Sequence, residues 1–332
     1  GNCRGYLQSV VKRARAMGLT VNVGCECEFY LFETDENGNP THIPLDHGGY
    51  FDIPPLDKGE NIRRDICLSI EEMGLQPEHS HHESGPGQNE VCFRYAPALK
   101  SADNLNTFKS AVKAIAARNG LYASFMPKPL HDQSGNGLHV NMSLMRDGKN
   151  LFESPLTPDS EAGYFVAGIL AHARELTAFC NPVPNSYARL GANEAPLYIS
   201  WSRQNRSQLV RLPSASGDLC RVELRGPDPA GNPYLVIGLI LAAGLDGIAR
   251  KLPLAEPVNR NLFHPSAAAG LESLPRSLRE AITVAAQSDF IAAELPLALQ
   301  NKYFEYQTQL CHGYENAPDP AVWERTHGFL VI

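Results

Sequence analysis

The chain has 332 residues and a formal net charge of −7, with 43% hydrophobic and 20% charged residues. This composition supports a substantial core and excludes a disordered acidic chain. The net negative charge argues that the protein does not bind nucleic acid, because phosphate backbones are bound by clustered Lys and Arg. With 27 Gly and 25 Pro residues, the sequence predicts a loop-rich enzyme-like chain, and no break in composition divides it into domains.

The cysteines and the apolar stretches predict where the protein resides. Its eight cysteines are scattered and form no CxxC pair, so we expect buried free thiols in a reducing compartment. The most apolar stretch, 235–245, is shorter than the roughly 20 residues that span a bilayer, and Asp246 interrupts it. No signal-peptide pattern opens the sequence. These features predict a cytoplasmic protein with no membrane partner.

Apolar residues at helical spacing alternate along the chain with loops rich in Pro and Gly. Residues 60–73, for example, carry Ile62, Ile66 and Ile70 and stop at Gly74. Asp103 is a plausible N-cap for the helix that follows it. The predicted helices cover residues 6–17, 60–73, 104–118, 159–179, 233–250 and 275–287.

Four predicted strands each combine an apolar face with an unusual polar face. In the strand 21–29, side chains alternate, so Glu26 and Glu28 point together away from the apolar set. The same alternation sets aside Glu90 and Arg94 in 90–95, His139, Asn141 and Ser143 in 138–144, and Arg221, Glu223 and Arg225 in 219–225.

These polar faces have an ordinary and a functional interpretation. An antiparallel sheet with one wet face is common, but such a face usually carries Lys, Thr and Ser, whereas this one carries Glu, His and Arg. Carboxylates suit divalent cations and guanidinium groups suit phosphates. The sequence therefore predicts a site for a metal-bound polyphosphate. Because it has no P-loop, Rossmann or nucleophile-elbow motif, metals and arginines would have to hold the phosphates of a nucleotide.

A resemblance to a known family rests on nine segments that occur in order along the chain. They are GCECEFYLF (24–32), GGYF (48–51), HHE (81–83), GQNE (87–90), GNGLH (135–139), NSYARL (185–190), EAP (194–196), NRS (205–207) and RVELRGPDP (221–229). Together they resemble the catalytic domain of type I glutamine synthetases, from about residue 6 to at least residue 250. The resemblance implies an α+β fold in which a curved, mainly antiparallel sheet forms an open active-site funnel backed by helices.

The resemblance also implies two divalent-metal sites for Mg²⁺ or Mn²⁺. The first set of ligands would be Glu28, Glu83 and Glu90. The second would be Glu26, His139 and Glu223. Hard oxygen ligands with one imidazole agree with this choice of metals.

The reaction that the resemblance implies is ligation of ammonia to the γ-carboxylate of L-glutamate. ATP drives it through γ-glutamyl phosphate, giving glutamine, ADP and phosphate. The implied catalytic residues are Glu194, Arg206 and Arg225. Substrate binding would involve Tyr50, Gly135 and Arg189 together with Glu194 and Arg225. The implied ATP contacts are Glu78, Asn141, Ser143, Arg206, Arg211 and Arg221.

Three departures from the family pattern keep alternatives open. Ser134 stands where the family usually has Asn, and the flap 191–196 is one residue shorter than usual and lacks its Tyr. Both changes concern the amino-acid and amine pockets, so a γ-glutamyl ligase for a polyamine or another primary amine remains an alternative, as does a noncatalytic relative. Phe263 replaces the family's adenylylation tyrosine, which predicts no control by tyrosyl adenylylation.

The resemblance finally bears on domains and partners. Residues 1–332 would form one catalytic domain, and the smaller N-terminal β-grasp domain of the family is expected to be absent from this sequence. We therefore expect the 332 residues alone to bind ATP and metal but to make little glutamine. The implied partners are glutamate, ammonia or an amine, ATP, and copies of the same chain in a dodecamer of two stacked hexameric rings.

Overall fold

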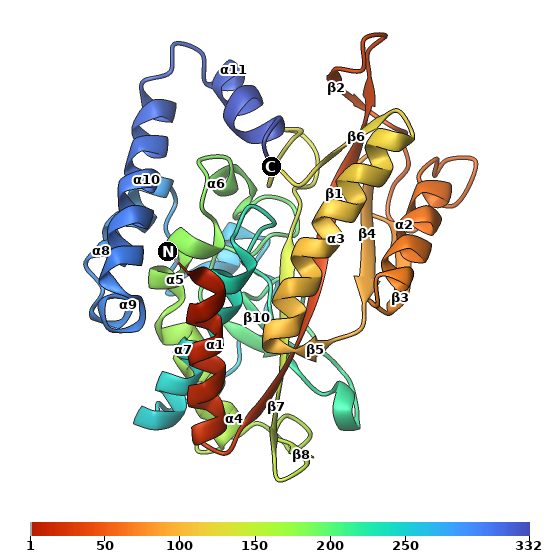
Figure 1. Ribbon diagram of the computed structural model, residues 1–332. Helices are drawn as coiled ribbons and strands as arrows, with labels where there is room; N and C mark the ends of the chain where they lie inside the picture. The colour runs from red at the N-terminus through yellow and green to blue at the C-terminus, as the bar shows by residue number, and fades with distance from the viewer. Residues whose placement is uncertain (1) are drawn as a thin grey trace.

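The computed structural model describes residues 2–332 and is organised around one eleven-stranded sheet (Figure 1). The main strand order is β3-β4-β1-β7-β11-β10-β9, with β2, β5 and β6 pairing with β1 and β8 pairing with β7. Only β9 and β10 run parallel among the paired strands described. The strands are β1 (Thr20–Thr34), β2 (Pro40–Pro44), β3 (Pro77–His82), β4 (Gln88–Phe93), β5 (Ala96–Pro97), β6 (Leu121–Ser124), β7 (Leu138–Arg146), β8 (Lys149–Asn150), β9 (Trp201–Arg203), β10 (Val210–Leu212) and β11 (Val222–Leu224).

Strand β1 carries the alternation that the sequence predicts. Val21, Val23, Cys25, Cys27 and Phe29 are all buried in the main hydrophobic core. The intervening residues, Glu26 and Glu28 among them, point to the opposite face of the sheet. Its register sets Glu28 opposite Glu90 of β4 and Glu26 opposite His139 of β7. The predicted α+β fold with a mainly antiparallel sheet is therefore confirmed.

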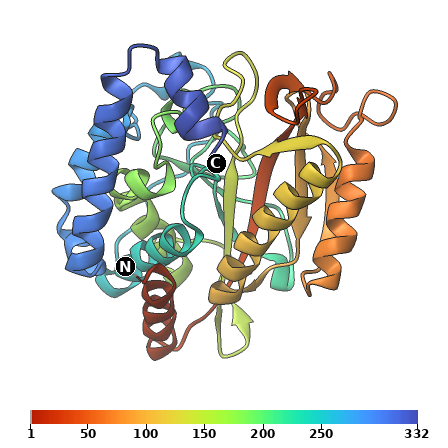
Figure 2. The same cartoon turned by 45° about the horizontal axis from the view of Figure 1, so that its top comes forward.

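The helices form layers that cover the sheet (Figures 1 and 2). Helix α3 packs on β1 and β6 with α2 beside it, whereas α1, α4 and α5 surround α7. The α-helices are α1 (Cys3–Ala16), α2 (Glu60–Glu72), α3 (Ala98–Arg118), α4 (Glu161–Ala171), α5 (Ala173–Cys180), α6 (Ser186–Arg189), α7 (Pro233–Arg250), α8 (Leu278–Ala286), α9 (Asp289–Glu294), α10 (Leu297–Glu315) and α11 (Pro320–Glu324).

Helix α7 is the central helix of the core. Its N-cap Asn232 accepts hydrogen bonds from the N–H groups of Tyr234 and Leu235, and it ends at Lys251 with φ 51°. It is the one helix within residues 2–332 that is long and apolar enough to cross a membrane, but 72% of its apolar window is buried inside the molecule. A Cβ atom on Gly168 of α4 would lie 2.2 Å from the Ala243 carbonyl oxygen. Glycine is therefore required where α4 packs directly on α7.

Two helix predictions need correction, and three C-terminal helices lie outside the predicted ranges. The helix predicted at 104–118 begins at Ala98, so Asp103 is not its cap but lies in its second turn, where it accepts hydrogen bonds from Arg4 and Tyr234. The helix predicted at 159–179 is two helices, which are separated by His172. The C-terminal helices α9–α11 were not predicted individually, because α10 buries only Leu299, Gln307 and Cys311 and so has no continuous apolar stripe.

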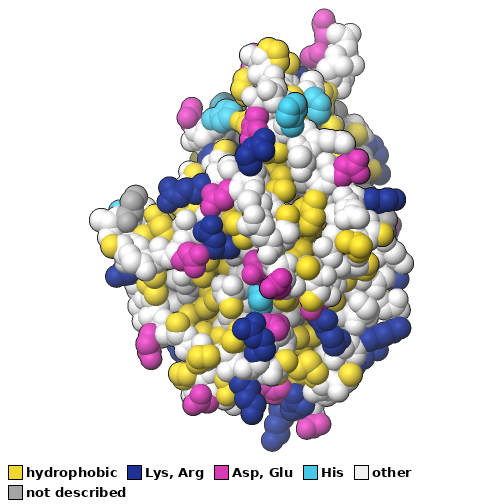
Figure 3. Space-filling view, turned by 90° about the vertical axis from the view of Figure 1, so that its left-hand side faces the viewer, with side chains coloured by type: hydrophobic (Ala, Val, Ile, Leu, Met, Phe, Trp, Pro, Cys, Tyr) yellow, Lys and Arg dark blue, Asp and Glu magenta, His cyan; other side chains and the backbone are white. Residues whose placement is uncertain are grey.

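On the face shown in Figure 3, hydrophobic side chains are interspersed with charged ones.

The C-terminal segment contacts two loops, the one that carries Lys128 and the one that precedes α6. Phe329, in the short π-helical turn Arg325–Phe329, packs with Tyr30, Phe32 and Met126. Just before this turn, Glu324 accepts a hydrogen bond of 3.2 Å from the Asn185 amide. That amide also bonds the backbone of Lys128 in both directions, at 2.7 and 3.1 Å. Asn185, which directly precedes α6, therefore links this helix to the segment that runs from Lys128 to Gly135.

Candidate active site

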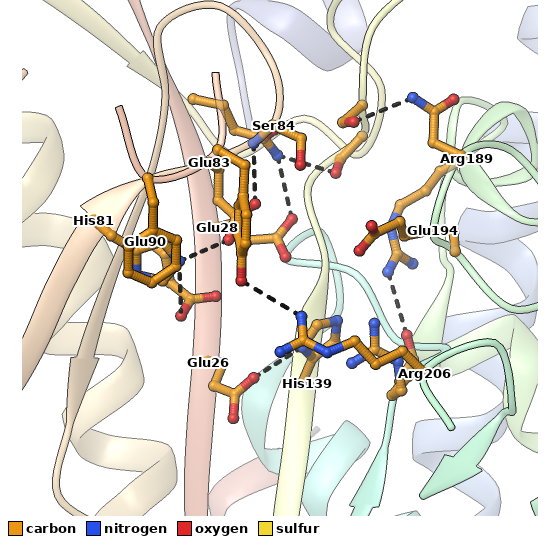
Figure 4. Close-up of a pocket in the computed structure, with 18 of the residues that line it drawn as sticks. Glu26, Glu28, His81, Glu83, Ser84, Glu90, His139, Arg189, Glu194 and Arg206 are labelled. Atoms are coloured by element: carbon orange, nitrogen blue, oxygen red, sulfur yellow. Dashed lines mark hydrogen bonds and ion pairs between the residues drawn. The ribbon is translucent and has the colours of Figure 1, made fainter. Parts of the chain in front are cut away.

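A cavity of about 300 Å³ opens over the polar face of the sheet (Figure 4). Carboxylates from β1, β4 and the loop after β3 line one side of it, and arginines from α6, β10 and the neighbouring loops, including the residues that flank β11, line the other. The predicted site residues in its wall are Glu26, Glu28, Tyr50, Glu83, Glu90, Gly135, His139, Arg189, Glu194, Arg206, Arg211, Arg221 and Arg225. Glu223 lies beneath this wall, fully buried, within reach of Glu26 and His139.

A second cavity of about 350 Å³ adjoins the first and shares Glu26, His79 and Arg221 with it. It is lined by Glu78, Asn141 and Ser143, which the sequence predicted to contact ATP. Arg221 is positioned between the two cavities by a hydrogen bond of 2.9 Å from its Nε to the Asn141 amide oxygen. The structure thus brings the predicted nucleotide contacts together beside the predicted metal ligands.

The first predicted ligand set, Glu28, Glu83 and Glu90, offers three carboxylate oxygens within 4.8 Å of one another. No Lys or Arg within residues 2–332 forms an ion pair with these three side chains. Burial and the charge of Glu83 raise the pKa of Glu28 to about 7. Burial and the charges of Glu26 and Glu28 raise the pKa of Glu90 well above its usual value. Crowded carboxylates without a compensating cation fit a divalent metal ion.

The second predicted set, Glu26, His139 and Glu223, also lies within 4.8 Å. His139 Nδ1 is 2.9 Å from Glu26 and 3.6 Å from Glu223. Burial opposes ionisation of Glu26, but its hydrogen bond and charge interaction with His139 lower the pKa of this carboxyl to about 2. Two carboxylates and an imidazole are suitable ligands for Mg²⁺ or Mn²⁺.

Arginines hold Glu223 from both sides. Arg211 Nε donates a hydrogen bond of 2.5 Å to Glu223 Oε2, and Arg225 Nη1 donates one of 2.8 Å to Oε1. Arg225 Nε is buried and has no hydrogen-bond partner within residues 2–332. An unpaired buried donor of this kind is available to an anionic substrate group.

Two further arginines complete the cationic side of the cavity. Burial lowers the pKa of Arg189, and its guanidinium group donates hydrogen bonds of 2.8 and 3.2 Å to the carbonyl oxygens of Gly226 and Arg225. Arg206 Nη1 donates a hydrogen bond of 3.4 Å to the Tyr50 hydroxyl. The cavity therefore contains converging guanidinium groups opposite the two carboxylate sets.

Gly135 occupies a crowded position in the wall. A Cβ atom there would lie 2.4 Å from the Pro127 carbonyl oxygen and 2.9 Å from Arg189 Cγ. Glycine is thus required by the protein's own packing around Arg189, in addition to any approach of a substrate.

Two of the three departures from the family pattern, Ser134 and the flap, meet at the mouth of this cavity. Asn193 of the flap has a left-handed backbone, with φ 52°, and its Nδ2 donates a hydrogen bond of 3.1 Å to Ser134 Oγ. The Ser134 carbonyl oxygen in turn accepts a 2.6 Å hydrogen bond from the Tyr30 hydroxyl. The flap that carries Glu194 is therefore tied to the loop that carries Gly135.

The sequence interpretation assigned no role to several residues that the structure places in the site. Gln88 Nε2 donates a hydrogen bond of 3.2 Å to Glu28 Oε2. The Cys92 thiol donates one of 3.0 Å to Glu90 Oε1. Gln88, Glu90 and Cys92 alternate along β4, so the spacing of two that identified Glu26 and Glu28 also identifies these partners.

Comparison with known proteins agrees with this geometry. Residues 1–326 match the family model for the catalytic domain of glutamine synthetase. The chain is 51% identical over 303 residues to glutamine synthetase of Methanosarcina mazei, covering 89% of this chain and 68% of that protein. It is 50% identical to glutamine synthetase of Clostridium saccharobutylicum, covering 85% of this chain and 66% of that protein.

A solved structure described as a "GmaS/ADP complex" superimposes with a TM-score of 0.86 at 33% identity, covering 98% of this chain and 76% of that one. The chain spans about two thirds of the length of the two glutamine synthetases, at 68% and 66%. Family model, sequence identity and fold all agree. The chain belongs to the glutamine synthetase family.

Proposed function

We propose that this protein catalyses the ATP-dependent ligation of ammonia to L-glutamate, giving glutamine. The observation that carries the proposal is the meeting of two metal-ligand sets and converging arginines at one cavity, beside a second cavity lined by the expected ATP contacts. Relatives at 50% and 51% identity are named glutamine synthetase, which favours ammonia over a larger amine. ADP in the related GmaS complex is consistent with nucleotide binding.

The two ligand sets fit divalent cations, with Glu28, Glu83 and Glu90 holding one and Glu26, His139 and Glu223 the other. When bound, Mg²⁺ or Mn²⁺ supplies positive charge that neutralises the phosphates and the charge developing on the transferred group. Arg211 and Arg225 hold Glu223 in its ligating orientation through bonds to both of its oxygens. This leaves the remaining guanidinium donors for the substrates.

The arginines would divide the substrate anions between them. Arg206, Arg211 and Arg221 would contact phosphate oxygens, with Glu78, Asn141 and Ser143 lining the rest of the nucleotide pocket. Arg189 would bind the α-carboxylate of glutamate and Arg225 its reacting end, near Gly135 and Tyr50. Fixed cationic donors of this kind orient the γ-carboxylate for attack on the γ-phosphate and stabilise the charge that moves.

Glu194 would complete the reaction at the flap. Its carboxylate lines the cavity opposite the metal ligands (Figure 4). In that position it would accept a proton from the incoming ammonium, and the flap would shield γ-glutamyl phosphate from water. Ammonia would then displace phosphate and form the amide bond.

The decisive assay measures phosphate release from ATP by the full-length protein with glutamate plus ammonium, beside a panel of diamines and monoamines. We expect turnover with ammonium and its loss in Glu83→Gln, with the exposed Glu33→Gln as a matched control. Turnover only with a larger amine would contradict the choice of ammonia. Absence of turnover with every amine, despite bound metal and ATP, would favour a noncatalytic role.

We also propose a homo-oligomeric assembly in the cytoplasm, with the dodecamer that the resemblance implies. Eight free cysteines, six of them buried, are consistent with a reducing compartment. The mass of the purified full-length protein by light scattering tests the assembly.

A further inference from the structure

A cluster of two imidazoles and a carboxylate lies at the edge of the sheet, beside the first metal-ligand set. His79 and His81 are two residues apart on β3 and so share a face of the strand. Strand β4 pairs antiparallel with β3, and Glu90 lies directly opposite His81. A ring nitrogen of each histidine and a carboxylate oxygen of Glu90 lie within 4.8 Å of one another.

The orientation of the His81 ring is fixed from several directions. Phe51 stacks on it with ring centroids 4.5 Å apart, and His79 lies nearly parallel to it at 6.0 Å. One ring nitrogen, Nε2, is 2.9 Å from Glu83 Oε1 and 4.0 Å from Glu90 Oε1. The other, Nδ1, is buried and has no hydrogen-bond partner within residues 2–332. Nε2 therefore faces two carboxylates, Glu83 and Glu90, while Nδ1 stays without a partner in the described part of the chain, which is uncommon for a buried imidazole nitrogen.

We propose that His79, His81 and Glu90 form a third cation site that takes Zn²⁺ or a chemically similar transition metal. Two imidazoles and one carboxylate, with a coordination position left for water, form a ligand set typical of zinc. Mg²⁺ instead favours six oxygen ligands in octahedral geometry. The site therefore selects a different class of metal from the all-carboxylate set beside it.

The position of the cluster determines how a cation reaches it and which other metal ion competes with that cation. His79 is exposed and lines both cavities, so a cation reaches the site from solvent. Glu90 belongs both to this cluster and to the first ligand set. Zinc at His79 and His81 therefore competes for a carboxylate that the first Mg²⁺ or Mn²⁺ needs, and binding of each metal weakens binding of the other.

The test measures Zn²⁺ binding to the full-length protein in excess Mg²⁺, by competition with a chromophoric chelator. His79 belongs to neither predicted ligand set, so His79→Ala removes a ligand of the proposed site and leaves both predicted sets intact. We expect this variant to bind one equivalent of Zn²⁺ at least about 10-fold more weakly than the wild type, as loss of a ligand predicts. The control His312→Ala, exposed on α10, keeps wild-type binding.

Two further measurements make the outcome decisive without any assay of enzyme activity. In the His139→Gln variant, which alters the second set, the extra Zn²⁺ equivalent should remain. With Co²⁺ in place of Zn²⁺, the visible absorption of an imidazole-ligated ion should be weaker in His79→Ala than in the wild type. Equal Zn²⁺ binding by wild type and His79→Ala, or loss of the extra equivalent in His139→Gln alone, would overturn the proposal.

Discussion

Asn193 donates a hydrogen bond from its side-chain amide to the hydroxyl of Ser134, across the mouth of the substrate cavity and over a distance of 3.1 Å. The two residues are 59 positions apart in the chain. Each is a point at which this sequence departs from the family pattern. A carboxamide is therefore present at this point of the cavity although residue 134 is Ser, and the short flap is held close to the Gly135 loop.

This contact predicts that the two departures act as a pair. Asn193→Gly removes the amide but tolerates the left-handed backbone at φ 52°, and Ser134→Ala removes the acceptor. A neutral hydrogen bond contributes about 0.5–1.5 kcal/mol, so each variant should lower kcat/KM for glutamate by roughly 2- to 10-fold.

A double-mutant cycle on steady-state kinetics of the full-length protein checks the pairing. If the contact carries the effect, the double variant is no worse than either single one. Effects that simply multiply would show that Ser134 and Asn193 act independently.

Much of the site follows from a local property of the sequence, the period of two in a strand. That period put Glu26 and Glu28 on one face of β1, and His139, Asn141 and Ser143 on one face of β7, without knowledge of the fold. It equally relates His79 to His81 and Glu90 to Cys92, which the sequence interpretation did not use. The sequence did not predict the register between strands, because the pairing of Glu28 with Glu90 depends on which strands become neighbours.

The remaining differences come from contacts between distant parts of the chain. Asp103 has the residue type of a cap, but Arg4 and Tyr234 bind it and the helix starts five residues earlier, at Ala98. His172 interrupts a predicted helix where Glu175 and Asp246 hold its ring. Both differences occur at side chains that bond residues far away in the chain, which a local sequence pattern does not reveal.

The two ligand sets predict separable metal binding. Glu83→Gln should weaken one equivalent of Mn²⁺ by at least about 10-fold and leave the other unchanged, and Glu26→Gln should do the reverse. Titration calorimetry on the full-length protein, with the exposed Glu33→Gln as control, distinguishes the two equivalents. If either variant abolished both equivalents while remaining folded, the assignment of the carboxylates to two separate sites would be wrong.

The raised pKa of Glu28 predicts how pH affects metal-dependent stability. Because this pKa rises from 4.5 to about 7 in the metal-free protein, the folded state holds a proton that the unfolded state releases near its lower value. Stability of the metal-free protein therefore falls as pH rises through this window. At higher pH, ionised Glu28 and the neighbouring carboxylates repel one another, and a bound divalent cation offsets this repulsion. The gain in Tm produced by Mg²⁺ should therefore be larger at about pH 8 than at about pH 5.5.

Thermal unfolding with and without Mg²⁺ at the two pH values checks this dependence. Glu28→Gln cannot titrate at this position, so its gain in Tm from Mg²⁺ should vary less with pH. A Mg²⁺ effect in the wild type that is equal at both pH values, or larger at the lower one, would exclude Glu28 as the group whose proton the cation displaces.

His172 predicts a second pH-dependent contribution to stability, remote from the cavity. Its Nδ1 lies 2.7 Å from Glu175 and its Nε2 lies 2.8 Å from Asp246, while Phe290 stacks on the ring at 3.8 Å. Burial opposes protonation, but the hydrogen bonds to both carboxylates raise the pKa of His172 above 6.5. The His172 ring therefore links Glu175 of α5 to Asp246 of α7, and Arg250 is a further cation on Asp246.

Replacing this side chain by His172→Gln should lower the free energy of unfolding by about 2 kcal/mol, the contribution of a hydrogen bond to a charged group. A raised histidine pKa gives stability that is fully present below the unfolded value of 6.5 and is lost as pH rises through the folded value. The difference between wild type and variant in urea unfolding should therefore be larger at about pH 6 than at about pH 9. The exposed His312→Gln, on α10, should show no such difference. If the free energies of unfolding of the wild type and His172→Gln differed by the same amount at both pH values, packing on Phe290, rather than the charge on the ring, would stabilise the contact between α5 and α7.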